Sequence, residues 1–441
     1  MDAAPYTVRQ ANTALTLLLL AYVLSFIDRN VMSVLIGPIR QDFAISDFQY
    51  SLLHGFAFSM FYITLGLPIA RMADRSSRIR IISGGIVLWS LMTCLCGYAR
   101  NFASLFLARM GVGVGEAALS PAAFSILADV FPPHKLPRAT AIYSLGITLG
   151  GGLAYILGSV VFDYFASLDL SAWRLLKDVR PWQLTFLAVG VPGFLVALCL
   201  RLLPEPPRTG GGAVTVAVPE QRSLAEVLGY FRQHWRVYVG VIGSMALMSV
   251  LGYGVMAWYP ELLIRIYEAD RSTAGSQFGL IFIISGSAGA LLGGWLCSTM
   301  IARGILDAPV RIIFGVCFLW AVPAALAPLS GSADRALLMA WPIIFFLNAY
   351  FGIGVSAVAL VTPANMRAQA SAVLLFFTNL FGLAFGPSAV AILTDFVYAD
   401  DAALDASLTT LPFLVLPPAA LLALLAMRPY RELATSLANR D

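Results

Sequence analysis

Long apolar stretches alternate with short polar connections along almost the whole chain. Each stretch holds about 20 residues or more, the length that a helix needs to cross a hydrocarbon core of roughly 30 Å. The pattern therefore predicts twelve membrane-spanning helices. The predicted spans are 12–36, 47–70, 79–98, 102–129, 137–162, 180–203, 235–262, 273–297, 309–329, 335–360, 366–396 and 404–427.

The composition agrees with lipid as the solvent of this chain. Of its 441 residues, 59% are hydrophobic and 12% are charged, and the mean hydropathy is +0.82. A soluble domain holds roughly 45–50% apolar and 25% charged residues, and it could not bury so much apolar surface. The strict alternation of polar and apolar residues that marks a membrane β-barrel is absent. We therefore expect an all-α membrane protein and not a soluble enzyme.

A polar break at 204–234 divides the predicted spans into two sets of six. We expect a six-helix bundle over 1–203, a cytoplasmic linker over 204–234 whose later part forms an amphipathic helix, and a second six-helix bundle over 235–441. The two halves echo each other weakly, since Arg138 opens span five and Arg367 opens span eleven in similar sequences. Repetition of this kind is typical of transporters that alternate access by rocking one bundle against another.

The basic residues predict the orientation of the chain, because connecting segments rich in Lys and Arg stay in the cytoplasm. The side that holds both termini carries 18 of the 28 Lys and Arg residues, and the other side carries 8. We expect both termini in the cytoplasm and the chain in a bacterial-type inner (plasma) membrane. The same asymmetry accounts for the net charge of +4, so the charge gives no reason to invoke nucleic acid.

Four ionisable residues lie deep in the predicted spans, namely Asp28 and Arg29 in the first and Arg109 and Glu116 in the fourth. A charge at mid-bilayer costs at least about 2.5–3.5 kcal/mol, so each needs a partner or water. Asp28 and Arg29 lie about 100° apart around a helix and cannot point the same way. Arg109 and Glu116 share a face but are about 10 Å apart along the axis, too far to pair directly. We expect Arg29 to meet Glu116 across the two spans, with Asp28 nearby.

This arrangement predicts a switch that responds to protons. Burial disfavours the charged form of a carboxylate, whereas arginine stays protonated. Protonation of Glu116 or Asp28 would free Arg29 to hold an anionic group, which couples a proton to a substrate. A structural ion pair that sets helix register is the alternative. His54 in the second span could also take part in proton transfer, or serve as a hydrogen-bonded packing residue.

Uncharged polar and aromatic residues occupy the second bundle at the corresponding depth. Together with His54 of the first bundle, five of them are expected to line a central cavity, namely Ser249, Tyr253, Asn348, Phe376 and Asn379. An aromatic stripe suits an amphipathic substrate, and ordinary helix packing explains it equally well. The stripe consists of Phe376, Phe377, Phe381 and Phe385.

The remaining motifs argue against catalysis or a bound cofactor. All five cysteines lie in apolar spans, which favours small core residues over disulfides or zinc ligands. The sequence offers no metal-ligand cluster and no nucleophile paired with a base. Gly111, Gly113 and Gly115 lie inside a predicted span, where they would let another helix approach Glu116 closely. We expect no cofactor and no metal, and energy from an ion gradient, with a proton in preference to sodium.

The connection between the second and third spans resembles the signature loop of the major facilitator superfamily. That signature is usually G-x-L-x-D-R-x-G-R-[KR], and its charged positions are matched by Asp74, Arg75, Arg78 and Arg80. The resemblance implies the major facilitator fold, with twelve helices in two pseudo-symmetric bundles, and a cytoplasmic gate against span eleven. The gate residues would be Asp74, Arg75, Arg78 and Arg138. The stretch from Gly294 to Arg303 has Ser298 where the acid would fall, so any gate there must be weaker or differently built.

Within that superfamily the chain is most similar to the spinster family of lipid transporters. The segments that carry this likeness are Phe26-Ile27-Asp28-Arg29, Gly113-Val114-Gly115-Glu116-Ala117, Ala128-Asp129-Val130-Phe131, Glu205-Pro206-Pro207-Arg208 and Trp258-Tyr259-Pro260. The resemblance implies a carrier of a lysolipid or sphingoid phosphate that works by alternating access. Asp28, Arg29 and Glu116 would be its coupling and headgroup residues, and Arg109 lies in the same span-four motif.

Other functions share these features. The organic anion:cation symporters also have the Asp-Arg pair in span one and a glycine-rich span four, but they usually close span four with a tryptophan-containing segment that this chain lacks. Drug:proton antiport is a third option, and a sensor that binds ligand without flux is a non-carrier alternative. We expect a monomer whose partners are a small amphipathic or anionic substrate, protons and membrane lipids.

Overall fold

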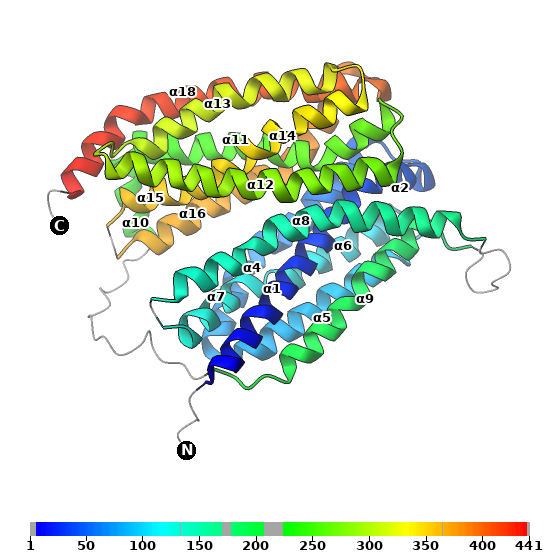
Figure 1. Ribbon diagram of the computed structural model, residues 1–441, viewed down its shortest axis with the longest axis horizontal. Helices are drawn as coiled ribbons and strands as arrows, with labels where there is room; N and C mark the ends of the chain where they lie inside the picture. The colour runs from blue at the N-terminus through cyan, green and yellow to red at the C-terminus, as the bar shows by residue number, and fades with distance from the viewer. Residues whose placement is uncertain (1–5, 133, 170–177, 207–223, 364, 439–441) are drawn as a thin grey trace. The chain divides into compact units, whose positions relative to one another are not determined.

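The computed structural model describes residues 6–132, 134–169, 178–206, 224–363 and 365–438, and the secondary structure of these residues is helical. The chain folds into two compact units (Figure 1). Unit 1 comprises Met1–Val214 and Ala269–Ile283, and unit 2 comprises Thr215–Glu268 and Ile284–Asp441. The middle of the predicted linker, residues 207–223, lies outside the described residues.

The helices follow the apolar stretches of the sequence closely. Those of unit 1 are α1 (Val8–Asn30), η1 (Val31–Val34), α2 (Ile36–Phe43), α3 (Asp47–Ser51), η2 (Leu52–Phe56), α4 (Ala57–Arg75), α5 (Arg78–Cys96), α6 (Phe102–Glu116), α7 (Leu119–Val130), α8 (Leu136–Ser167) and α9 (Pro181–Arg201). The helix α12 (Arg271–Ala302) is divided between the units. Those of unit 2 are α10 (Leu224–Gln233), α11 (Trp235–Arg265), α13 (Ala308–Leu326), η3 (Ala327–Leu329), α14 (Ala333–Ala349), α15 (Phe351–Leu360), α16 (Arg367–Asn379), η4 (Leu380–Phe385), α17 (Gly386–Ile392), η5 (Leu393–Tyr398), η6 (Asp401–Ala403) and α18 (Leu404–Ala438).

Eleven helical runs in the described part of the chain are long and apolar enough to cross a membrane. They coincide, within a few residues at most ends, with eleven of the twelve predicted spans. The remaining predicted span, 47–70, falls on α3, η2 and α4, which are helical but are not among the eleven. The chain is an integral, multi-pass membrane protein, and the twelfth crossing and the cytoplasmic termini stay predictions.

Several spans are interrupted inside the membrane-spanning region. Span one changes from α1 to the 3₁₀ helix η1 at Val31, and span four breaks between Glu116 and Leu119. Span ten breaks at Tyr350, between α14 and α15. Interruptions leave backbone groups without helical partners, so they are places where ions and polar side chains can bind.

Glycines let the helices of unit 1 pack backbone to backbone, as the sequence predicted for span four. A Cβ on Gly113 would lie 2.3 Å from the carbonyl oxygen of Phe58, and a Cβ on Gly115 would lie 2.7 Å from that of Gly85. These contacts press α6 against α4 and α5. The first part of α12 packs on α8 by the same means, since a Cβ on Gly279 would lie 2.4 Å from the Gly152 carbonyl oxygen.

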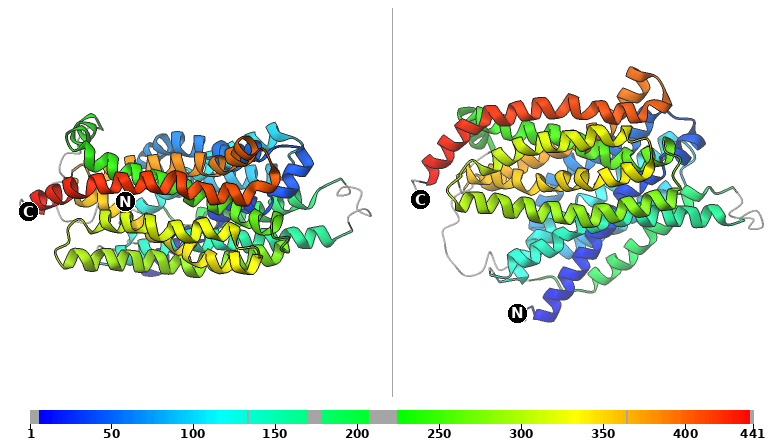
Figure 2. Two further views of the ribbon diagram at one scale, coloured as in Figure 1. Left: turned by 90° about the horizontal axis from the view of Figure 1, so that it is seen from above. Right: turned by 45° about the horizontal axis from the view of Figure 1, so that its top comes forward.

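In unit 2 the last helix is the main packing partner of two others. The helix α18 lies along both α11 and α13 (Figure 2). Ser244 of α11 fixes one of these contacts, because its hydroxyl donates to the carbonyl of Ala419 at 2.9 Å. The small residues Gly240 and Ala426 allow the close approach.

Candidate functional site

A buried ion pair joins the first and fourth spans within unit 1. Arg29 lies at the end of α1 and Glu116 at the end of α6, and Nη2 of Arg29 donates to Oε2 of Glu116 at 2.6 Å. Ser25, one helical turn before Arg29, donates its hydroxyl to the same oxygen at 2.7 Å. The pairing of Arg29 with Glu116 that the sequence predicted is therefore present in the structure.

The second arginine of the site, Arg109 of span four, holds the backbone of span one and not a carboxylate. Nη1 of Arg109 donates to the carbonyl of Asp28 at 3.1 Å, and Nη2 lies 3.5 Å from the carbonyl of Arg29. These carbonyls are available because α1 ends at Asn30, and the last carbonyls of a helix lack helical donors. Arg109 is fully buried, and its hydrogen bonds hold the last turn of α1, which carries Arg29, in place.

Asp28 and Arg29 point in different directions, as their spacing required. The carboxylate of Asp28 lies beside Thr93 of α5 and within electrostatic range of Arg109. Only 1% of Asp28 and 2% of Glu116 is exposed. One oxygen of each carboxylate, Oδ1 of Asp28 and Oε1 of Glu116, has no hydrogen-bond partner among the described residues. A buried carboxylate oxygen without a partner is costly, and the cost is larger while the carboxylate is charged.

Aromatic rings surround the Arg29 guanidinium. Its carbon lies 4.5 Å from the centre of the Phe58 ring, 4.8 Å from that of Phe26 and 5.1 Å from that of Tyr62. Ring faces attract a cation, most strongly where water is excluded. The guanidinium can therefore stay in this place when Glu116 no longer holds it by charge.

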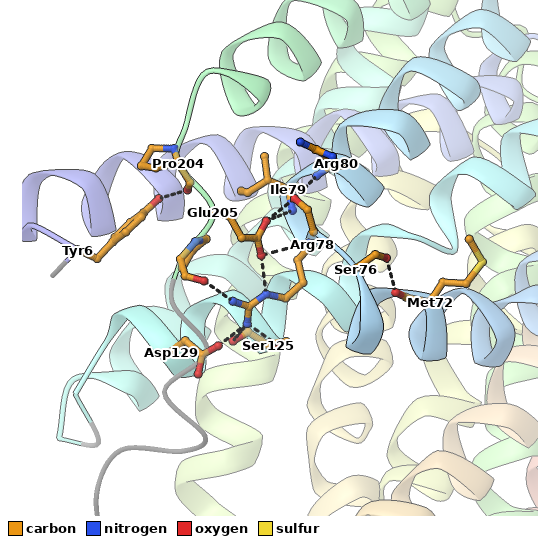
Figure 3. A network of polar contacts seen from close by, with 12 residues as sticks. Tyr6, Met72, Ser76, Arg78, Ile79, Arg80, Ser125, Asp129, Pro204 and Glu205 are labelled. Carbon is orange, nitrogen blue, oxygen red and sulfur yellow. Dashed lines mark hydrogen bonds and ion pairs between the residues drawn. The ribbon is translucent and has the colours of Figure 1, made fainter. Parts of the chain in front are cut away.

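Arg78, one of the expected gate residues, is enclosed by partners from unit 1 (Figure 3). Its Nε donates to Glu205 at 3.0 Å, its Nη1 donates to Asp129 and to the Ser125 hydroxyl, and its Nη2 donates to the Pro206 carbonyl at 2.9 Å. Arg78 is 2% exposed. The acids Asp129 and Glu205 come from the ends of spans four and six, so the Arg78 cluster, Arg78 with Asp129 and Glu205, joins three spans at one end of the bundle.

The charge of Glu205 is well supported in this cluster. Partial burial raises the pKa of Glu205, but hydrogen bonds from the Ser77 hydroxyl and from the backbone N–H groups of Ile79 and Arg78 outweigh that effect. The guanidinium of Arg78 acts in the same direction, and the pKa of Glu205 lies below its ordinary value. Because Glu205 caps the first turn of α5, it also meets the positive end of that helix.

The sequence model of the Major Facilitator Superfamily matches residues 18–387, most of the chain. The chain belongs to this superfamily. A crystal structure of a bacterial homologue of the human lysosomal transporter spinster, inward-facing and unoccupied, matches with a TM-score of 0.80 at 27% identity and covers 98% of both chains. The spinster resemblance seen in the sequence is thereby confirmed.

Two relatives of the superfamily carry other names. An MFS-type efflux pump of Mycolicibacterium smegmatis is 27% identical over 400 residues, which cover 88% of this chain and 85% of the pump. A probable L-galactonate transporter of Escherichia coli is 25% identical over 77% of this chain and 74% of that protein. The superfamily and the fold are those of carriers, and the names of the relatives differ in substrate.

The other expected gate residues of the superfamily loop have different surroundings. Arg75 and Arg138 are exposed on unit 1, and the side chain of Asp74 lies outside the described part of the structure. The gate against span eleven therefore stays a prediction for Asp74, Arg75 and Arg138. For Arg78 the structure shows the partners Asp129 and Glu205 within unit 1, and its part in a gate likewise stays a prediction.

His54 lies in the π-helical turn η2, close to the site in unit 1. Its Nε2 is 3.0 Å from the hydroxyl of Ser33, and its Nδ1 has no hydrogen-bond partner among the described residues. One ring nitrogen is thus held by span one. This contact agrees with either a packing role or a proton-transfer role for His54.

The residues of unit 2 that were expected to line a cavity differ in exposure. Ser249 is 1% exposed, its hydroxyl donates to the Met245 carbonyl of the same helix, and it packs beside Gly382, so its place in a central cavity stays a prediction. Asn348 and Asn379 are half-buried, as is Tyr253. The aromatic stripe is partly exposed, at 45% for Phe376, 37% for Phe377, 37% for Phe381 and 48% for Phe385. A stripe of this exposure is not a packed core.

Unit 2 also holds buried charges that the sequence analysis did not include. Glu261 in α11 is 3% exposed and pairs with Arg265 at 3.1 Å. Because Glu261 lies near the end of its span, the expectation of uncharged polar groups at mid-depth in the second bundle stays a prediction. The sequence places Glu261 one residue inside the predicted end of span seven, and an acid at that place was the sign of a buried charge in the second bundle.

A second ion cluster lies before the ninth span. Asp307, with 2% of its side chain exposed, accepts from Arg311 at 3.0 Å and from Arg431 at 2.7 Å. Burial raises the pKa of Asp307, but the hydrogen bonds from Arg431 and Arg311 outweigh it and hold the pKa below its ordinary value. We call Asp307 with Arg311 and Arg431 the Asp307 cluster; whether a gate lies at this connection stays a prediction.

Proposed function

We propose that the chain is a proton-coupled carrier of an anionic, single-chain lipid and that Arg29 and Glu116 exchange partners during transport. The observation that carries this proposal is the buried Arg29–Glu116 pair, in which one oxygen of Glu116 has no hydrogen-bond partner in the described part of the chain. Intramembrane charges are retained for function by default. An arginine that already binds one carboxylate can bind an anionic headgroup in its place.

The coupling follows from competition for one guanidinium. When Glu116 is ionised, it holds Arg29 and excludes another anion. When a proton binds to Glu116, the carboxyl group becomes neutral, and Arg29 is free to pair with the substrate. By linkage, the substrate must raise the proton affinity of the site by the same factor as the proton raises the substrate affinity.

Asp28 and Arg109 have supporting parts in this scheme. Arg109 binds the backbone carbonyls of Asp28 and Arg29, so the end of α1 keeps its place whichever partner Arg29 has. Asp28 offers a second buried carboxylate on the other side of the same helix. A proton could reside on either acid, and the two carboxylates share the charge of the neighbouring arginines.

A single-chain lipid suits the remainder of the molecule better than a small polar solute. Four partly exposed phenylalanines of α16 and η4 offer an apolar surface in unit 2. The resemblance of the sequence to the spinster family, which implies a lysolipid substrate, supports the same class. A sugar acid is the second candidate, because a relative is named a probable L-galactonate transporter and an acid of that kind would also pair with Arg29.

Uptake into liposomes tests both candidates. The purified protein is reconstituted, a pH gradient is imposed, and accumulation of lysophosphatidic acid and of galactonate is measured separately. We expect gradient-driven movement of the lysolipid and none of the sugar acid. Glu116→Gln should abolish the dependence on the gradient, whereas Glu432→Gln, a change of an exposed acid, should leave it intact. Accumulation of galactonate alone would replace the lipid proposal with the second candidate.

A further inference from the structure

A crevice lies between α12 and the tenth span in unit 2. The two helices first touch at their small residues, since a Cβ on Gly289 would lie 2.2 Å from the carbonyl oxygen of Phe345. A Cβ on Gly293 would likewise lie 2.5 Å from the carbonyl oxygen of Ala349. Tyr350 follows at once and breaks the tenth span. Beyond this break the two helices no longer close on each other.

The crevice begins where the tight contacts end. Gly294 and Gly352 face open space, because a Cβ on either would meet no atom within 4 Å. The cavity has a volume of about 380 Å³, within the range of roughly 300–1,000 Å³ that holds small ligands. Besides these two glycines, small and aliphatic residues form most of its walls, among them Cys297, Ile301, Ile353, Ala359 and Leu360.

The hydroxyl protons of the walls are already used in hydrogen bonds within the helices and are not available to a polar solute. The two hydroxyls that line the crevice are used within their own helices, from Ser298 to the Trp295 carbonyl at 2.9 Å and from Ser356 to the Gly352 carbonyl at 3.2 Å. The remaining wall atoms are mostly apolar. An alkyl chain is therefore the ligand that gains most from entering, at about 0.8 kcal/mol for each buried methylene.

One charge stands at the end of the crevice. Arg367, the first residue of α16, lines the cavity and is exposed. Its Nε donates to the Thr362 carbonyl at 2.9 Å, which fixes the plane of the guanidinium. No acidic residue is among the described residues that line the crevice. The crevice thus presents an apolar wall with a cation at one end, which is complementary to an anionic lipid.

We infer that this crevice binds a single-chain anionic lipid, with the acyl chain along α12 and α15 and the headgroup at Arg367. The inference rests on the proposed function for the class of its ligand, and it adds a binding place outside unit 1. A free anion would gain only the contact with Arg367, whereas the lipid also fills the apolar wall.

Photolabelling of the whole protein in phosphatidylcholine nanodiscs tests this inference. The probe is lysophosphatidic acid with a diazirine in its acyl chain, and the labelled peptides are identified by mass spectrometry. We expect labelling of α12 between Gly294 and Ile301 and of α15. The matching uncharged monoacylglycerol probe should label the same peptides much less.

Substitutions at the open glycines should remove the site without disturbing the fold. Gly352→Leu and Gly294→Leu place a side chain in the crevice where no atom obstructs it, and each should lower labelling about tenfold. Gly315→Leu is the matched control, because Gly315 of α13 also faces open space and lies outside the crevice. Arg367→Gln should reduce labelling by the anionic probe to the level of the uncharged one.

The outcomes separate this inference from the proposed function. Labelling that persists in both leucine variants, or that is equal for the two probes, overturns the crevice as the binding place even if lysolipid flux is normal. Crevice labelling that behaves as expected, without any flux in liposomes, keeps the binding site and removes the proposed transport. Size-exclusion profiles and thermal unfolding of each variant report whether the fold is retained.

Discussion

Arg431 donates two hydrogen bonds to Asp307, one from Nε at 3.0 Å and one from Nη2 at 2.7 Å. The residues join the beginning of α13 to the last turns of α18. Arg78 and Glu205 have the same relationship in unit 1, where they join the beginning of α5 to the segment after α9. In unit 1 the base is at the start of the third span and the acid follows the sixth, whereas in unit 2 the acid precedes the ninth span and the base is in the twelfth. The two halves therefore have an ion pair at the same place with the charges reversed.

Loss of the central cation should weaken unit 1. In Arg78→Gln, the carboxylates of Asp129 and Glu205 lose their common buried partner. Breaking a buried ion pair costs about 3–5 kcal/mol, and we expect the lower end, about 3 kcal/mol, because the side chain of Glu205 is 32% exposed. Denaturant unfolding in detergent measures the change. The control is Arg80→Gln, two residues further along and exposed, which should shift stability by less than about 0.5 kcal/mol. Equal effects of the two variants would contradict the account of the cluster.

The Asp307 cluster should give unit 2 a stability that depends on pH. Because the folded pKa of Asp307 lies below the ordinary value of about 3.9, its contribution is fully present above that pH and is lost as the pH falls through the folded pKa. The difference in unfolding temperature between the natural protein and Asp307→Asn should therefore be constant from pH 7 to 5 and shrink in more acidic solution. Glu432→Gln, in the exposed pair with Arg428, serves as the control and should show little difference at any pH. A difference that grows in acid would show that the sign is wrong.

Close helix packing beside the candidate site predicts a large effect of one methyl group. In Gly113→Ala the new Cβ would lie 2.3 Å from the Phe58 carbonyl oxygen, so α6 and α4 must separate. Overpacking of this kind costs about 1–3 kcal/mol. The displacement also moves Glu116, three residues further on, away from Arg29, and transport should fall together with stability. Gly315→Ala adds the same methyl group in open space and should change neither quantity.

Replacement of Arg29 separates charge from shape at the site. In Arg29→Lys the positive charge remains, but the planar fork that reaches Glu116 and stacks on Phe58 is lost. We expect transport to fall at least about tenfold while the unfolding temperature changes little, because the charge of Glu116 is still compensated. The measurement is initial uptake into liposomes at saturating gradient. Full activity of the lysine variant would mean that only the charge of residue 29 matters.

The ion pair of the candidate site could be predicted because isolated charges in lipid have few ways to be satisfied. Only four ionisable residues lie deep in the spans, which left Glu116 as the natural partner of Arg29. Arg109 was excluded as the partner of Glu116 because the two are too far apart along one helix. Asp129 and Glu205, the partners of Arg78, were also visible in the sequence. Their role was missed because both lie at the ends of spans, where charges are common and carry little information.

Other features depend on packing that one sequence does not specify. Asp307 and Arg431 are 124 positions apart, and nothing in their separation along the chain indicates that they form a pair. Gly293 and Gly294 are neighbours, yet the first meets a backbone carbonyl and the second faces an open crevice. Glycine in a sequence permits both results, and only the placement of the neighbouring helix decides between them.

Proton uptake on substrate binding tests the exchange of partners at Arg29 most directly. Lysophosphatidic acid is added to the purified protein in weakly buffered detergent solution, and the change in pH is measured at each degree of saturation. If the anion displaces Glu116 from Arg29, binding should draw up to about one proton from solution, and Glu116→Gln should bind the lipid without taking up a proton. Binding to the natural protein without proton uptake, or the same uptake by Glu116→Gln, would contradict the account.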